Sequence, residues 1–295
     1  MASGFEGFMQ MFLRSLETGS VFALMALAII IIFRTSAFMH FAQGTMSMFN
    51  TYIVAYMLRS HGVSLLVAIL LGICGSLVAA FLVDFIVIRR AKKAPGVSKQ
   101  IITLGLIMVF MGLVPIIFGV DMMRIPRIIQ AGSFTVFGAS ISHNAVFNIV
   151  FGLTVMAILF YVLMNTKLGL AVRATASNEP IARLMGVPTR KITLFAWMTA
   201  GLLGLFAGIM IAPAMTVTTT MMVPVQLNAL IACVLGGFGT FFGPVVAAYL
   251  IAIAFNMTAY YVSSVWAWQI IYGAILIFLV FRPNGLFGKR FVKKV

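Results

Sequence analysis

The sequence has few acidic residues, histidines and cysteines. Its 295 residues include 5 Asp or Glu, 3 His and 2 Cys. Acid–base and metal chemistry depends on clusters of these side chains, and neither such a cluster nor a nucleophile beside a base is present. Cys74 and Cys233 lie in apolar stretches without metal-ligand spacing, so we expect buried, unreactive thiols. Neither an enzyme nor a metal site is therefore expected.

A phosphate-binding loop is also missing. The pattern GxxxxGK[ST] does not occur, because Gly288-Lys289 lacks both the following hydroxyl and the upstream glycine. We therefore expect that the chain does not hydrolyse ATP. Only Asp84 places a carboxylate within a long apolar stretch, whereas carriers driven by protons or sodium commonly use buried carboxylates. A secondary carrier would need uptake that depends on an ion gradient and on Asp84.

Apolar residues are abundant instead. Hydrophobic residues make up 63% of the chain and charged residues only 8%, which leaves too little polar surface for a water-soluble protein of this length. Apolar runs of about 17 to 25 residues recur, each long enough to cross ~30 Å of hydrocarbon. We predict an all-α polytopic membrane helical bundle, a single domain over residues 1–295, with eight or nine crossings, some broken or short. Nine crossings place the N-terminus outside; eight place both termini inside.

The positive charge is grouped. The net charge is +15, and five basic residues fall in each of three segments, namely 89–99, 167–191 and the tail from Arg282. Short loops rich in Lys and Arg stay in the cytoplasm, so these segments mark the inner side. Asp84, about one turn before Arg89, is expected to pair with the first cluster. The grouped positive charge therefore indicates which loops lie on the cytoplasmic side of the membrane, and it gives no reason to expect nucleic acid as a partner.

A polar segment, residues 167–191, interrupts the apolar second half. Asn178 is a good N-cap and Pro180 suits a first turn, while Gly186 ends the pattern. The predicted helix has about two turns, far fewer than the roughly 12 to 15 residues needed for marginal stability alone. Its apolar stripe must therefore be buried, either against a docked partner or against the rest of this chain. The stripe contains Ile181, Ala182, Leu184 and Met185.

Residues 34–50 place polar side chains between two apolar runs. Polar groups at membrane depth cost free energy unless they face protein or water, so they are candidates for a translocation path. Gly44 permits a break in the helix. The alternative is an inner-side loop followed by a slightly polar helix start. The polar side chains are Arg34, His40, Gln43, Thr45, Ser47 and Asn50.

The run 225–239 is too short to cross a membrane alone. Its 15 residues span roughly 22 Å as a helix. A helix broken by glycine commonly lines a transport path, and Gly236, Gly237 and Gly239 provide that break. A compact turn between two ordinary helices is the alternative. In the preceding apolar span, 192–212, Gly204 and Gly208 form a small-xxx-small face suited to close helix contact.

Two further segments lie outside the apolar runs. Residues 1–17 are predicted to be an amphipathic, interfacial lead-in. The outer loop 120–144 alternates apolar and polar residues, which fits a short strand or an interfacial helix. This loop either receives a partner or only caps the bundle.

Four stretches resemble the membrane permease subunits of ABC importers for branched-chain amino acids, the LivH-like group. The stretch 169–192, GLAVRATASNEPIARLMGVPTRKI, is the most specific, and 234–250, VLGGFGTFFGPVVAAYL, is moderately so. The stretches 38–52, FMHFAQGTMSMFNTY, and 282–288, RPNGLFG, are weaker alone. Their order and spacing also fit, so the resemblance covers nearly the whole chain.

The resemblance implies a permease of the bacterial plasma (inner) membrane that works with several partners. These are a second related permease, two cytoplasmic ATPase subunits, an extracytoplasmic solute-binding protein, a small-molecule solute and membrane lipid, without nucleic acid. It implies no cofactor on this chain, because ATP and magnesium would be held by the ATPase subunits. The segment 167–191 would be the coupling loop. Its expected ATPase-coupling residues are Arg173, Ala174, Asn178, Glu179, Ala182, Leu184, Met185 and Gly186.

The expected translocation path combines the two irregular segments. Where relatives usually show Asn, an acid and Gly, this sequence has His40, Thr45 and Asn50. Similar permeases import urea or short amides, so the resemblance leaves the solute open. A self-sufficient channel or facilitator for a small neutral solute such as urea or an amide is the alternative function. The expected path residues are His40, Gln43, Gly44, Asn50, Gly236, Gly237 and Gly239.

Overall fold

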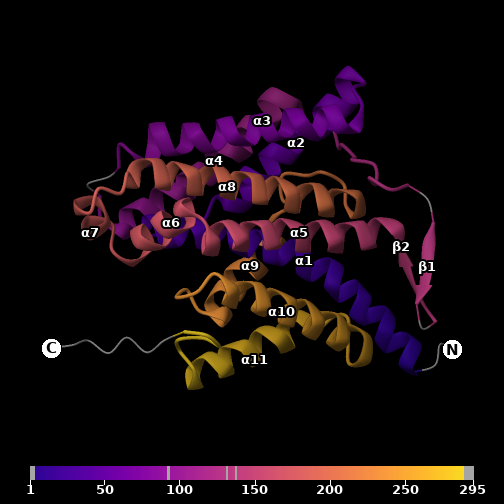
Figure 1. Ribbon diagram of the computed structural model, residues 1–295. Coiled ribbons are helices and arrows are strands. Elements are labelled where there is room, and N and C mark those ends of the chain that lie inside the picture. The colour runs from indigo at the N-terminus through magenta and orange to yellow at the C-terminus, as the bar shows by residue number, and fades with distance from the viewer. Residues whose placement is uncertain (1–3, 92–93, 131, 137, 289–295) are drawn as a thin grey trace.

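The computed structural model describes residues 4–91, 94–130, 132–136 and 138–288. In these residues the chain is a bundle of helices with one short β-hairpin at one end (Figure 1). The start of α1 lies at the hairpin end, and α11 ends toward the opposite end (Figure 1). We call the second end the basic end, because Arg89, Lys99 and Arg190 all belong to it.

The helices of the first half alternate with short connections. The elements are α1 (Gly4–Ser36), α2 (Gln43–His61), α3 (Leu65–Leu82), which continues as a π-helical segment, η1 (Val83–Ile88), then α4 (Gly96–Phe118), β1 (Ser133–Val136), β2 (Ala139–Ser142) and α5 (His143–Asn165). The second half contains α6 (Lys167–Ser177), α7 (Glu179–Leu184), α8 (Thr189–Ile211), a 3₁₀ turn, η2 (Ala212–Ala214), α9 (Val223–Gly236), α10 (Phe242–Tyr261) and α11 (Ala267–Phe281).

The helices confirm a membrane-spanning bundle with short members. Six of the described helical segments are long and apolar enough to cross a membrane, whereas the apolar helices α9 and α11 have only 14 and 15 residues. Among the described elements, nine helices form the bundle, namely α1–α5 and α8–α11, while α6 and α7 lie at the basic end. The start of α1 and the end of α11 lie toward opposite ends, as the nine-crossing alternative requires (Figure 1).

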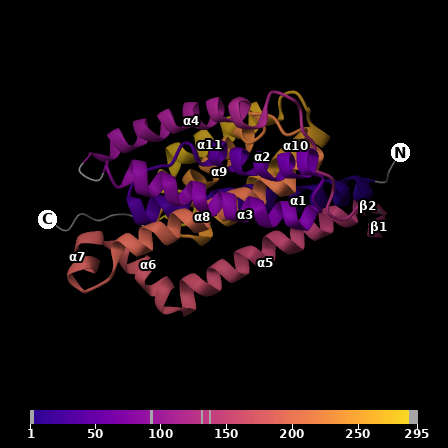
Figure 2. The ribbon, with the colours of Figure 1, turned by 90° about the horizontal axis from the view of Figure 1, so that it is seen from above.

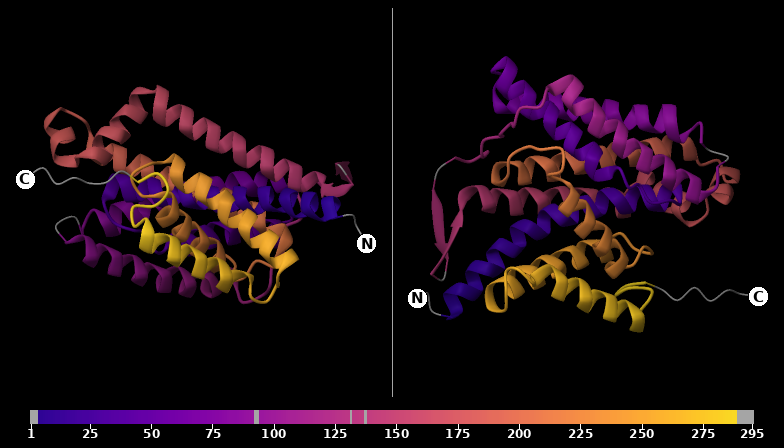
Figure 3. Two further views of the ribbon diagram at one scale, coloured as in Figure 1. Left: turned by 90° about the horizontal axis from the view of Figure 1, so that it is seen from below. Right: turned by 180° about the vertical axis from the view of Figure 1, so that it is seen from behind.

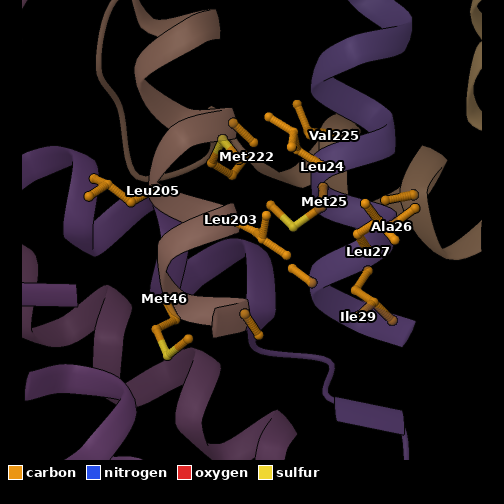
Figure 4. Packing of buried hydrophobic residues seen from close by; sticks show 14 of the residues in the cluster. Leu24, Met25, Ala26, Leu27, Ile29, Met46, Leu203, Leu205, Met222 and Val225 are labelled. Carbon is orange, nitrogen blue, oxygen red and sulfur yellow. The ribbon is translucent and has the colours of Figure 1, made fainter. Parts of the chain in front are cut away.

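Helix α1 passes through the middle of the bundle (Figures 1 and 3). Its residues 23–32 are completely buried and pack against α8, α9 and α10. Figure 4 shows Leu24 and Met25 of α1 beside Leu203 of α8 and the start of α9, where Met222 and Val225 lie. A helix that is apolar on every side needs neighbours on every side, and α1 has them.

Small residues let the helices approach closely. A Cβ added at Gly204 would lie 2.0 Å from Ser47 Oγ, and one at Gly208 would lie 2.0 Å from Thr51 Oγ1. The predicted small-xxx-small face of α8 therefore packs directly on α2. By contrast, α3, α4 and α5 expose large apolar side chains such as Leu66, Met108 and Ile158, as helices in contact with lipid do.

Several sequence predictions need correction. Within the described residues no separate lead-in precedes α1, because the helix continues from Gly4 to Ser36. Cys74 is exposed on α3, and only Cys233 is buried. The outer segment forms a β-hairpin, so the strand alternative was correct.

Candidate functional site

A row of polar side chains lies buried at the start of α2. His40, Gln43, Ser47 and Asn50 are all fully buried. The spacing from Gln43 to Asn50 places three of them on one side of the helix, and His40 extends the row toward the basic end. The structure thus brings three predicted path residues together. It buries them inside this chain, with α8 directly alongside.

Much of this row has no hydrogen-bond partner in the described protein. Gln43 Nε2 donates to the carbonyl of Ala200 at 2.8 Å, and Ser47 Oγ donates to the carbonyl of Gln43 at 2.7 Å. Both ring nitrogens of His40, Gln43 Oε1 and the side-chain amide of Asn50 have none. A buried polar group without a partner costs about 1–3 kcal/mol. The row therefore lowers the stability of the fold unless a polar solute or water supplies the missing hydrogen bonds.

Gln226 of α9 clamps the first turn of α2. The Gly44 N–H donates to Gln226 Oε1 at 2.6 Å, and Gln226 Nε2 donates to the carbonyl of Phe41. Gly44 is required for this approach, since an added Cβ would lie 2.3 Å from Gln226 Oε1. Gly44 therefore does not break the helix; the break lies before α2, where Ala37 has φ 57°. The sequence does not single out Gln226, because its only signal is its place in the first turn of a short helix.

The chain between η2 and α9, residues 215–222, forms no regular helix or strand. Between η2 and α9, Val217 is buried, its N–H bonds to the carbonyl of Met123, and its carbonyl accepts from Tyr52 Oη at 3.2 Å. Backbone of this kind is tolerated at membrane depth only against protein or water. The predicted short helix is therefore present with 14 residues, but the irregular chain precedes it. At the predicted glycine break, residues 237–241 form a compact turn into α10.

The glycines at the end of α9 have a different environment from the polar row. An added Cβ at Gly236 would lie 2.2 Å from the Gly243 carbonyl carbon, so these two backbones touch. Gly237 has φ +90° and lies against Asn284 and Gly288, while Leu286 N–H donates to the carbonyl of Leu235 at 2.7 Å. The motif 282–288 thus closes the end of α9. Gly239 is exposed with open space around it.

The polar segment 167–191 folds into two helices that project at the basic end (Figure 2). Helix α6 was not predicted, although Thr166 caps it by accepting from Gly169 N–H at 3.1 Å. Arg173 ties α6 to the end of α5 through the carbonyl of Met164 at 3.4 Å. The Ala174 carbonyl then accepts from Asn178 N–H at 3.1 Å and ends α6.

Helix α7 is the predicted two-turn helix. Asn178 Oδ1 accepts from Ile181 N–H at 3.1 Å, Glu179 pairs with Arg183, and Gly186 ends the turn with φ +83°. Ala182 is buried against this chain. Leu184 and Met185, however, are 87% and 79% exposed. The chain therefore covers only Ala182, the small residue of the stripe, and leaves Ile181, Leu184 and Met185 exposed.

These features define a class. Apolar helices able to span a membrane, an irregular buried segment beside a polar row, and an amphipathic turn outside the bundle together indicate a membrane transport component. Residues 11–280 match the family described as branched-chain amino acid transport system / permease component. The chain belongs to this family and is a multi-pass protein of the inner membrane.

Its relatives are distant but mostly of the same length. The chain is 25% identical to the high-affinity branched-chain amino acid transport system permease protein LivH of Salmonella typhimurium and 24% identical to that of Escherichia coli K12, over the whole of both chains. It is also 30% identical to the L-arabinose ABC transporter permease protein AraH of Azospirillum brasilense, over 58% of this chain and 49% of that one. No solved structure matches it. The chain is thus the permease component of an ABC-type transport system.

Proposed function

We propose that this permease belongs to an ATP-driven importer for branched-chain amino acids or similar small polar solutes. It provides half of the translocation path, and α7 couples it to cytoplasmic ATPases. The observation that carries this proposal is the exposure of Leu184 and Met185 on a helix too short to be stable alone. Fully burying side chains of this kind contributes about 1.5–3 kcal/mol each, enough to make them interface anchors.

The proposal includes a set of partners. The basic end faces the cytoplasm under the positive-inside rule, so an ATPase pair that holds ATP and magnesium would meet α7 there. A second related permease would complete the path, and an external solute-binding protein would approach the hairpin end. This chain would hold no cofactor itself. The relatives named for branched-chain amino acids support the solute class.

Charged substitutions on α7 test the docking role. In Leu184→Glu and Met185→Glu, a buried unpaired carboxylate would stand at the interface, so we expect loss of ATPase co-purification and of ATP-dependent uptake. Val120→Glu is the matched control, because Val120 is also 87% exposed but lies beyond α4 near the opposite end. Unchanged ATPase association and uptake in both α7 variants, with normal membrane insertion, would exclude docking through α7.

A second candidate function is a self-sufficient channel or facilitator for a small neutral solute such as urea. The observation that favours it is that the polar row lies within this one chain and contains no fixed charge. Purified chain reconstituted alone in liposomes separates the two functions. Solute flux without ATP or other subunits would support the channel, and flux that requires the ATPases would support the importer.

A further inference from the structure

A charged cavity lies at the basic end of the bundle. Its volume is about 380 Å³, within the range of roughly 300–1,000 Å³ found for small-ligand sites. Five elements border it: the end of α1, η1, and the starts of α4, α7 and α8. The side chains that matter here are Ser36, Phe38, Asp84, Lys99, Glu179 and Arg190.

Two cations in this cavity are not neutralised by the described protein. Asp84 is paired with Arg89 at 2.8 Å, and Glu179 is paired with Arg183. Lys99 and Arg190 form no ion pair within the residues that the structure describes. Both belong to the first turns of helices, α4 and α8, where the helix dipole adds partial positive charge. The cavity therefore favours an anionic group.

The cavity also offers a hydrogen-bonding group. Ser36 Oγ is buried at its wall and has no partner in the described chain. Hydroxyl and cationic donors together match a carboxylate, which accepts several hydrogen bonds. A neutral sugar or urea would gain little from Lys99 and Arg190.

A short aromatic barrier separates the cavity from the polar row. Phe38 is buried, borders the cavity, and has its ring centroid 6.3 Å from that of Trp197. The Trp197 ring lies 4.6 Å from His40, the first member of the polar row. Lys99 Nζ lies 6.0 Å from the centre of the Phe38 ring, on the cavity side. Movement of Phe38 and Trp197 would thus join the row to the cavity.

We infer that this cavity is the inner release site of the path, where Lys99 and Arg190 hold the carboxylate of the departing solute. The inference rests on the proposed importer function and narrows its solute to molecules that carry a carboxylate. Phe38 closes the site toward His40 in this conformation. Glu179 of α7 borders the same cavity, so a movement of α7 against its ATPase would reach the site directly.

Direct binding tests this site. Radiolabelled leucine is added to the nucleotide-free complex in neutral-lipid nanodiscs, purified without the solute-binding protein. Leucinol, which lacks the carboxylate, and 4-methylpentanoate, which lacks the ammonium group, serve as competitors. We expect 4-methylpentanoate to displace leucine at least tenfold better than leucinol. Equal displacement, or better displacement by leucinol, would overturn the inference.

The matched variants locate the carboxylate. Lys99→Ala and Arg190→Ala should weaken leucine binding about tenfold, and Lys99→Arg, which keeps the charge, should restore most of it. Arg124→Ala is the control, because Arg124 is exposed, outside the cavity and unpaired in the described chain. Unchanged binding in both alanine variants would refute the site. Co-purification of each variant with the ATPases shows that a loss of binding does not come from misassembly.

An anionic lipid headgroup carries similar chemistry and is tested separately. Phosphatidylglycerol is added to the nanodiscs at increasing fractions. If this lipid, but not leucine, loses affinity in Lys99→Ala and Arg190→Ala, the cavity holds lipid and the inference is wrong. ATP-driven leucine uptake by the wild-type complex is measured in parallel. Leucine uptake that is unchanged in the Lys99 and Arg190 variants defeats only the release site. Absence of ATP-driven uptake of every branched-chain amino acid and similar small polar solute tested would defeat the importer itself.

Discussion

The side chain of Gln226 holds the backbone of Gly44 at 2.6 Å, and this contact joins the short helix α9 to the first turn of α2. Two irregular segments that lie more than 180 residues apart are therefore one structural unit. The same amide also binds the carbonyl of Phe41, in the loop that contains His40. Any displacement of α9 would be passed to the polar row.

The first prediction concerns this contact. Gly44→Ala places a Cβ 2.3 Å from Gln226 Oε1, so we expect loss of about 1–3 kcal/mol of unfolding free energy and reduced uptake. The double variant Gly44→Ala with Gln226→Ala should regain part of both. Gly105→Ala in α4, with open space around it, is the control. Thermal unfolding of the purified complex measures stability, and a fully stable Gly44→Ala would contradict the prediction.

The second prediction separates transport from stability in the polar row. Asn50→Leu replaces an unpartnered buried amide with an apolar side chain of the same heavy-atom count and branching, so the chain should gain about 1–3 kcal/mol of stability. Uptake should nevertheless fall, because the path would lose a polar contact. Denaturation and uptake are measured on the same preparation. A purely structural role predicts that stability and uptake change in the same direction.

The third prediction concerns the glycines that close α9. Gly236→Ala forces a Cβ to 2.2 Å from the backbone of Gly243, which cannot rotate away. We expect a large loss of folded complex, measured as yield and unfolding temperature. Gly239→Ala should be tolerated, since Gly239 is exposed with open space around it. Equal tolerance of both substitutions would show that the contact between α9 and α10 is not tight.

The fourth prediction concerns Asp84. Its carboxylate is 2% exposed and bonded to Arg89, so Arg89→Ala leaves a buried acceptor without its partner and should cost at least about 1–3 kcal/mol. Asp84→Asn should cost less and should retain ATP-driven uptake without dependence on an ion gradient. Uptake that follows an ion gradient and is abolished by Asp84→Asn would instead identify a secondary carrier.

Local signals in the sequence predicted much of the fold. Asn178, Pro180 and Gly186 define α7 because capping depends on a few neighbouring residues. The pairing of Asp84 with Arg89 was predicted for the same reason, since the two residues are one turn apart.

Long-range contacts could not be predicted in this way. Nothing near Gln226 indicates that its side chain reaches Gly44, and nothing near Trp197 indicates its place beside His40. Gly236 and Gly237 were assigned to the path because helices broken by glycine commonly line transport paths. Their actual neighbours, Gly243 and the motif 282–288, are set by the packing of the complete chain. The role of these glycines in transport stays a prediction.

The accessibility of α7 in the assembled transporter tests the central claim most directly. A cysteine introduced as Leu184→Cys, in a Cys74→Ala background, is labelled with a membrane-impermeant maleimide from the cytoplasmic side. We expect rapid labelling of the chain alone and strong protection in the complete, transporting complex. Equal labelling rates in both preparations would show that no ATPase covers α7, which would contradict the coupling role proposed for this permease.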